Sequence, residues 1–220
     1  MCIRDRLKTA GLARGSARDA ALATLVVWDE QLARHGAELL EARLALVDDL
    51  RPYVGKAYET VARGASRDDA EIEYRSSFDL PADLDSLVDA LLEALAERRN
   101  DELDRGISLV GPHRDELQLS LGTPQTRLPV KGYASHGESW SFALALRLAS
   151  YDLLRADGDD PILILDDVFA ELDTERRGQL ADLVSGAEQV LVTAAVAADV
   201  PESLTGVRYV VGNGEVTRDG

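Results

Sequence analysis

A short apolar run that ends in two carboxylates constrains the fold of this chain more than any other feature. Residues 161–167 read Pro-Ile-Leu-Ile-Leu-Asp-Asp, which predicts a buried strand with Asp166 and Asp167 at its carboxyl end. A helix is expected at 174–184 and a further strand at 189–193. Because a strand, a helix and a second strand joined by short connections form a βαβ unit, the sequence predicts a parallel sheet.

The carboxylate pair is a candidate site because ligands bind at the carboxyl ends of strands in open α/β sheets. Side chains alternate along a strand, so one carboxylate can serve a magnesium ion while the other orients or deprotonates a water. A strand that simply ends in a polar turn is the alternative. Residues 168–173, Val-Phe-Ala-Glu-Leu-Asp, favour the site. An apolar strand, a carboxylate pair and a following Glu-Leu-Asp are much rarer in combination than any one of these three features.

A second candidate segment, Ala-Ser-His-Gly-Glu at 134–138, opens an apolar helix expected at 138–154. A serine before a helix is a typical N-cap. The free amides of a helix N-terminus can bind an anion, and Gly137 leaves room for a phosphate near the backbone. An ordinary N-cap is the alternative here. The single long helix between this segment and the apolar strand makes both segments more specific together than apart.

The rest of the chain divides into a helical region and an α/β region. Apolar pairs recur every seven residues over 18–50, which predicts a long helix. Pro52 closes this segment or starts the next one, a short helix expected at 54–63. The run covers only about four heptads, so a bundle face is favoured over a coiled-coil partner. Further expected elements are strands at 71–76, 107–110, 117–121 and 207–211, a helix at 84–99 and a hairpin turn at 212–214. The expected domains are an extraneous start at 1–6, a helical arm at 7–105 and an α/β domain at 106–220.

Composition excludes several classes of protein. The 220 residues carry a net charge of −16 and one cysteine. An acidic chain of this kind is a poor candidate for avid, nonspecific nucleic-acid binding by itself. A single cysteine cannot form a disulfide framework or a cysteine-based zinc site, and it fits a reducing, cytoplasmic setting. No apolar run approaches the roughly 20 residues that a membrane-spanning helix needs.

Taken together, these motifs resemble the RecF family of ABC-type ATPases, which are related to SMC heads. Residues 135–138 resemble the ABC signature, 162–167 a Walker B strand and 171–173 the D-loop that follows it. Three stretches resemble hallmarks of the family: 111–117, 131–135 and 166–173. The likeness extends over most of residues 20–215. It implies an α/β fold, the C-terminal part of an ABC-type P-loop ATPase head with a parallel sheet and flanking helices, plus a helical arm called lobe II.

The resemblance also implies roles for individual residues. Such ATPases dimerise head to head around two ATP molecules, with the signature of one subunit facing the nucleotide of the other. Asp166 would serve the Mg²⁺, and Asp167 would be the catalytic carboxylate that polarises the attacking water. Thr193 would lie at the switch position near the γ-phosphate, and Asp173 of the D-loop would reach across the dimer. The residues implied to contact ATP in trans are Ser135, Gly137 and Glu138.

The family resemblance further implies a function in DNA replication, DNA damage repair and the SOS response. Members bind duplex DNA and ssDNA–dsDNA gap junctions in an ATP-dependent way. They act with RecR and help to load RecA onto gaps in recombinational repair. ATP and Mg²⁺ would be the cofactors, the active form would be an ATP-dependent homodimer in the cytoplasm, and no membrane would be involved.

The phosphate loop of the family, Gly-x-x-x-x-Gly-Lys-[Ser/Thr], does not occur in this sequence. The only Gly-Lys pair, Gly55–Lys56, is followed by Ala57 and lacks the first glycine. We therefore expect a C-terminal RecF fragment with negligible ATPase activity alone, and a sheet that lacks strands and exposes an unpaired edge. The alternative is a non-hydrolytic protein-interaction module that caps another ATPase head, which the acidic charge favours. The roles of His113 and Arg114, structural or phosphate-positioning, stay open.

Overall fold

The computed structural model describes residues 16–62, 67, 69–158 and 160–219. The expected extraneous start at 1–6 lies outside these residues. No helix among them is both long enough and apolar enough to cross a membrane.

The chain folds as two compact units that interleave in sequence. The first comprises the residues up to Pro52 together with Glu71–Ser120, and the second comprises Tyr53–Ala70 together with Leu121–Gly220. The expected boundary at 105/106 marks a change in the character of the sequence, and it stays a prediction.

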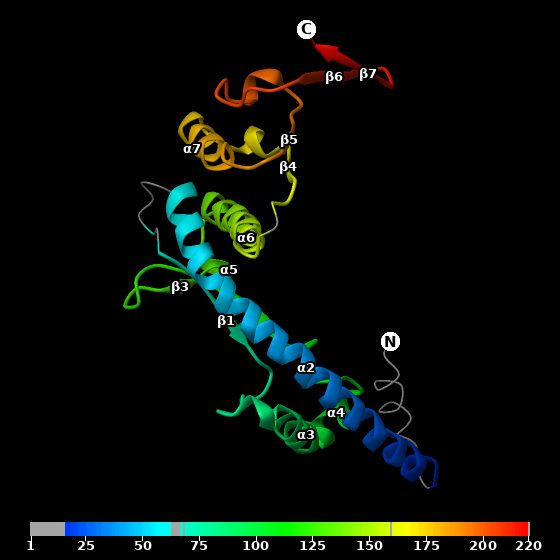
Figure 1. The fold of residues 1–220 in the computed structure, drawn as a ribbon. Coiled ribbons are helices and arrows are strands. Elements are labelled where there is room, and N and C mark those ends of the chain that lie inside the picture. The colour runs from blue at the N-terminus through cyan, green and yellow to red at the C-terminus, as the bar shows by residue number, and fades with distance from the viewer. Residues whose placement is uncertain (1–15, 63–66, 68, 159, 220) are drawn as a thin grey trace. The chain divides into compact units, whose positions relative to one another are not determined.

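The longest element is α2, a helix of 46 residues from Ser16 to Val61 (Figure 1). The expectation that Pro52 separates two helices is wrong, because Pro52 lies inside α2. Proline lacks an amide donor and clashes with the preceding turn, which costs a helix about 3 kcal/mol. The helix continues beyond it because the next turns bury their apolar side chains, and Val54 and Tyr58 are fully buried.

In the first unit α2 packs against α3, Leu87–Glu97, which follows the short 3-10 helix η1, Leu84–Ser86. The expected helix at 84–99 is thus confirmed in large part. Gly36 is the point of closest approach, since a Cβ there would lie 2.8 Å from Leu91 Cδ2. The glycine therefore costs α2 some helix propensity but lets the two helices meet.

A further short helix, α4 at Arg99–Arg105, was not foreseen from the sequence pattern. The strand expected at 107–110 is wrong, because these residues form a loop. The backbone amides of Leu109 and Val110 donate to Glu102 Oε1 at 2.6 and 3.3 Å. Glu102 is 1% exposed, so a buried carboxylate rather than a neighbouring strand satisfies these amides.

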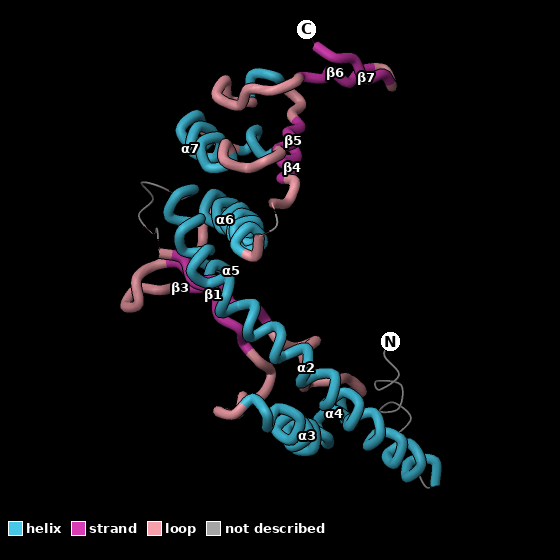
Figure 2. The backbone as a smooth tube through the Cα atoms, in the orientation of Figure 1, coloured by secondary structure: helices cyan, strands magenta, loops and turns pink. Residues whose placement is uncertain are grey.

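A three-stranded sheet has the order β1-β2-β3, with β1 at Ala70–Arg75, β2 at Glu116–Leu121 and β3 at Leu128–Pro129. Figure 2 labels β1 and β3 of this sheet and draws strands in magenta. The strands expected at 71–76 and 117–121 are confirmed. A four-residue helix, α5 at Val130–Tyr133, leads from β3 towards the candidate signature.

The second unit contains the βαβ unit that the sequence predicts. Helix α6 spans His136–Ala156, and β4, Leu163–Asp166, pairs in parallel with β5, Val190–Thr193. Between the two strands lie the 3-10 helix η2, Val168–Glu171, and helix α7, Thr174–Val184. The fully buried Phe142 of α6 contacts Tyr58 of α2, with ring centroids 5.4 Å apart. Parallel pairing and the helix at 174–184 are therefore confirmed.

The chain ends in a hairpin. After the 3-10 helix η3, Ala197–Asp199, strand β6 at Arg208–Gly212 pairs antiparallel with β7 at Glu215–Asp219. Asn213 and Gly214 both have positive φ, as a tight hairpin turn requires, so the hairpin expected at 212–214 is confirmed.

Candidate functional site

The carboxyl ends of β4 and β5 bring three of the predicted residues together. Asp166 is in register with Thr193 across the parallel pair. The Thr193 hydroxyl donates to Asp166 Oδ1 at 2.5 Å and accepts the Asp167 backbone amide at 3.1 Å. All three residues are exposed. The edge of the sheet therefore presents two carboxylates, one of which is held by a hydroxyl from the neighbouring strand.

Asp167 has a left-handed backbone conformation, with φ 53° and ψ 23°. Aspartate tolerates this region better than most residues, but it remains less favourable than an extended conformation. The amide of Asp167 also donates to the carbonyl of Thr193 at 3.2 Å, and this bond helps to hold the turn. Residues held in such conformations cluster at functional sites, which favours a site over an ordinary strand end.

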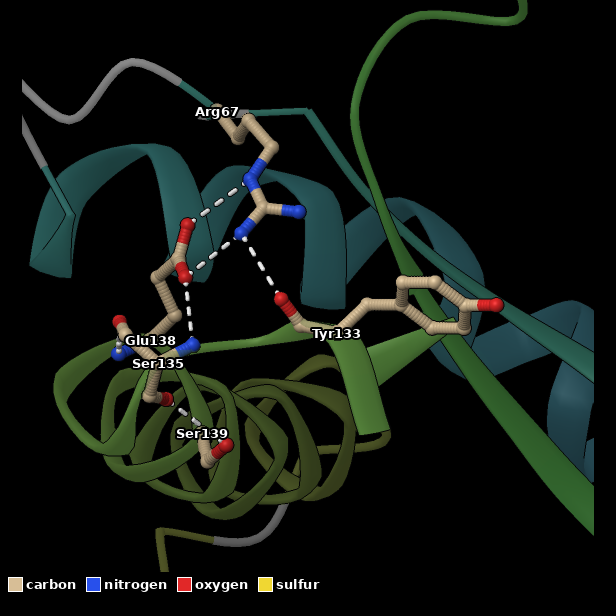
Figure 3. Close-up of polar contacts among 5 residues, drawn as sticks. All are labelled: Arg67, Tyr133, Ser135, Glu138 and Ser139. Carbon is tan, nitrogen blue, oxygen red and sulfur yellow. Dashed lines mark hydrogen bonds and ion pairs between the residues drawn. The ribbon is translucent and has the colours of Figure 1, made fainter. Parts of the chain in front are cut away.

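The turn at the start of α6, residues 133–138, is called the signature turn below. Ser135 is the N-cap of α6, and its Oγ accepts the Glu138 amide at 3.2 Å. The Glu138 carboxylate in return accepts the Ser135 amide at 2.8 Å, which completes a capping box (Figure 3). The N-cap role of Ser135 is confirmed. Since Ser135 Oγ is the acceptor in this bond, its hydroxyl proton remains available to a ligand.

Arg67, on the segment before β1, forms a two-pronged ion pair with the signature turn. Its Nε and Nη2 donate to Glu138 Oε1 and Oε2 at 2.9 and 2.7 Å, and Nη2 also donates to the Tyr133 carbonyl at 3.4 Å (Figure 3). The Arg67 and Glu138 side chains are only 26% and 17% exposed. The hydrogen bond from the Ser135 backbone, aided by Arg67, lowers the pKa of Glu138. Glu138 is therefore ionised and doubly anchored.

Arg67 was not predicted from the sequence as a site residue, and no local sequence pattern indicates its role. It lies 71 residues from Glu138, and only the tertiary fold brings the two together.

Asp173, which the sequence assigns to a D-loop, caps the next helix. Its Oδ1 accepts the Arg176 amide at 2.9 Å, which makes it the N-cap of α7. A Cβ built on Gly137 would lie 3.8 Å from Arg176 Nη1, so the start of α7 lies beside the signature turn. The role of Asp173 across a dimer stays a prediction.

The residues at the β4–β5 edge fit a magnesium ion only as part of a shared site. The described residues contain no group of three or more histidine, cysteine, aspartate or glutamate side chains that could hold a metal by themselves. Magnesium at phosphate sites is bound by one or two carboxylates, by the substrate phosphates and by waters. Asp166 and Asp167 match the protein's share of such a site.

The segment 111–117 is a structural loop within the first unit. The Asp115 carboxylate accepts the Tyr74 hydroxyl and the Ser77 amide, each at 2.7 Å. Arg114 Nε donates to the Ser108 carbonyl at 2.6 Å, which favours the structural role for Arg114. Hydrogen bonds hold this loop together with the buried Pro112, which lies beside Gly36 of α2.

The second unit has an α/β fold, in which helices flank the parallel β4–β5 pair. No family model matches the chain. Curated relatives do match it, and they are named DNA replication and repair protein RecF. The protein from a Nocardioides species is 77% identical over 206 residues, which are 92% of this chain and 49% of the relative. The Streptomyces avermitilis protein is 58% identical, over 96% of this chain and 56% of its own length.

Solved structures agree on the fold. RecF bound to ATP aligns with a TM-score of 0.77 at 23% identity, over 99% of this chain and 55% of that one. A separate structure, RecF with ATPrS in place of ATP, aligns with a TM-score of 0.76 at 23% identity, over 98% of this chain and 54% of that one. Both structures are of RecF as a recombination mediator protein in the RecFOR pathway. The chain is thus homologous to RecF and spans about half the length of the curated relatives it matches.

Proposed function

We propose that this chain contributes to a RecF-like protein of DNA replication and repair that binds DNA in an ATP-dependent way. The names of the relatives and the nucleotide in the aligned structures support this proposal. The observation that carries it is the Asp166–Asp167–Thr193 cluster at the carboxyl edge of the parallel β4–β5 pair. A protein with a purely structural function has no need of two exposed carboxylates at this edge.

At the β4–β5 edge, Asp166 would hold the Mg²⁺ of one ATP, together with the phosphates and waters. Asp167 would orient the attacking water and accept its proton. Thr193 positions Asp166 through its hydroxyl and would itself lie near the γ-phosphate.

The signature turn would act on the ATP held by a second copy. Ser135 would donate its free hydroxyl proton to the γ-phosphate, while Gly137 would let the phosphate approach the first-turn amides of α6. Glu138 would support this surface through its capping box with Ser135 rather than as a ligand of the phosphate, and Asp173 would reach across the dimer from the start of α7. Each active site would therefore take residues from two subunits.

The proposed partners follow from the same function. They are duplex DNA, ssDNA–dsDNA gap junctions, RecR and a second copy bound through ATP, with RecA loading as the outcome. Cytoplasm is the proposed location. The phosphate loop would come from a segment of a longer protein, of which this chain is a fragment, so the 220 residues alone would not turn over ATP.

The test is Asp167→Asn in a longer protein that carries the phosphate loop. Loss of the carboxylate should reduce ATP turnover at least about 100-fold, as expected for a general base. ATP-driven dimers should persist, because asparagine keeps the size of the side chain and tolerates the left-handed backbone. Turnover and dimerisation are measured by phosphate release and by light scattering. Asp182→Asn, at an exposed aspartate of α7, is the control and should leave both unchanged.

The second candidate is a non-hydrolytic module that caps another ATPase head. The lack of a Gly-x-x-x-x-Gly-Lys loop in this sequence favours it. Under this function Asp167→Asn changes neither turnover nor assembly. Unchanged turnover in that variant therefore contradicts the ATPase proposal and supports the module.

A further inference from the structure

Arg67 stands out because the proposed chemistry does not use it, although it makes the strongest polar contact of the signature turn. Two charge-assisted hydrogen bonds of 2.9 and 2.7 Å join its planar guanidinium to Glu138 in parallel geometry. A third bond, at 3.4 Å, reaches the Tyr133 carbonyl on the other side of Ser135 (Figure 3). Arg67 therefore holds the turn both before and after the N-cap serine.

Charge explains why such a partner is needed. The signature turn offers a phosphate the hydroxyl of Ser135 and the first-turn amides of α6. Glu138 lies in the same turn, and its carboxylate would repel a phosphate if it were unpaired or free to swing outward. The capping bond to the Ser135 amide fixes one oxygen of this carboxylate, and Arg67 fixes both and cancels the charge.

We infer that Arg67 is a positioning residue for the signature turn: it neutralises Glu138 and holds it in the capping box, so that Ser135 and Gly137 receive the phosphate. This inference rests on the proposed function. It adds that Arg67, which lies outside the turn in sequence, controls how well the turn accepts nucleotide by way of Glu138.

The test uses the longer protein with its phosphate loop and measures the ATP concentration that gives half-maximal dimerisation. Arg67→Gln should raise this concentration about tenfold, the effect of losing one charged hydrogen-bonding partner. Arg67→Lys should recover part of the loss, because it restores the charge without the two-pronged geometry. Arg155→Gln is the matched control, since it removes an arginine–aspartate pair at the other end of α6 and should shift the value less than about twofold.

Adding Glu138→Gln to Arg67→Gln separates neutralisation from a merely structural bridge. Glutamine still completes a capping box but carries no charge. The double variant should therefore return most of the way to the parent value. The inference is overturned if the double variant needs as much ATP for half-maximal dimerisation as Arg67→Gln does. It is also overturned if Arg67→Gln shifts this concentration no more than Arg155→Gln does. If the parent protein itself forms no ATP-dependent dimer, the proposed function fails first and the inference fails with it.

Discussion

Single polar side chains link the loop at 111–117 to the elements around it. Tyr74 of β1 illustrates this in the first unit. Its hydroxyl donates to Asp115 Oδ2 at 2.7 Å and accepts from Arg43 Nη1 at 3.2 Å. Arg43 in turn donates to the Pro112 carbonyl at 2.7 Å. One phenol thus ties helix α2 and strand β1 to the loop at 111–117.

Replacing Tyr74 by phenylalanine should destabilise the chain by about 2 kcal/mol at neutral pH, because Asp115 loses a hydrogen-bond donor. Burial, followed by the hydrogen bond to Asp115, raises the pKa of Tyr74. A raised pKa in the folded state means that the stabilisation is complete below the unfolded value of about 10 and is lost as the pH rises through the folded value. Urea unfolding of the two proteins across this range measures the difference.

The control for Tyr74 is Tyr209→Phe, at an exposed tyrosine of β6, which should change stability by less than about 0.5 kcal/mol. A Tyr74→Phe protein as stable as the Tyr209→Phe protein at neutral pH would contradict the role given to the phenol.

Residue-scale prediction from sequence succeeded where the cause is local. Ser135 directly precedes the apolar helix in the sequence, so its N-cap role could be predicted, whereas the capping box with Glu138 was not foreseen. Thr193 and Asp166 could be placed at one edge because parallel strands end together. Arg67 could not be found, and neither could the left-handed backbone of Asp167, because both depend on contacts that the folded chain creates.

At the scale of elements, periodicity predicted α7, β4 and β5 well, since each follows a clear apolar pattern. Two interpretations failed for a shared reason. The sequence predicts that Pro52 closes one helix or starts the next and that 107–110 form a strand, yet α2 continues through Pro52 and 107–110 form a loop. In both places tertiary packing, around Val54 and around the buried Glu102, outweighs local preference.

Pro52 therefore gives an element-scale prediction. It is the last residue of the first unit's α2 stretch, and the helix runs through it despite a missing amide bond. Pro52→Ala should raise the free energy of unfolding by about 1–3 kcal/mol, because alanine restores the donor and removes the clash with the preceding turn. Thermal and urea unfolding measure the gain. Lys56→Ala, one turn later at an exposed position, is the control and should stay within about 0.5 kcal/mol. A Pro52→Ala protein less stable than the parent would mean that the second unit depends on the proline.

At the scale of the whole chain, charge and length set what these residues can do alone. The chain spans about half the length of its curated relatives, and the parallel β4–β5 sheet has two strands among the described residues. Ile162, Ile164 and Leu191 are each about half exposed or more on or beside this sheet. A sheet of two strands among the described residues leaves an outer edge on each strand, which agrees with the expectation of an unpaired edge, and the exposed apolar side chains show that a face of the sheet is uncovered as well. Local sequence patterns do not predict which segment of a longer protein would pack against these side chains.

The net charge of −16 leads to the last prediction, which concerns DNA. Affinity for duplex DNA comes chiefly from counterions that lysine and arginine displace, so an acidic chain gains little from the phosphates. The 220 residues alone should bind a gapped duplex with a Kd of about 100 μM or weaker at about 150 mM salt. A longer protein with its phosphate loop should bind more tightly when ATP is present. Fluorescence anisotropy at two salt concentrations measures the Kd of the chain alone and of the longer protein. If the chain alone binds tightly and its affinity rises as the salt concentration falls, the prediction is wrong and the chain has a basic surface that its net charge conceals.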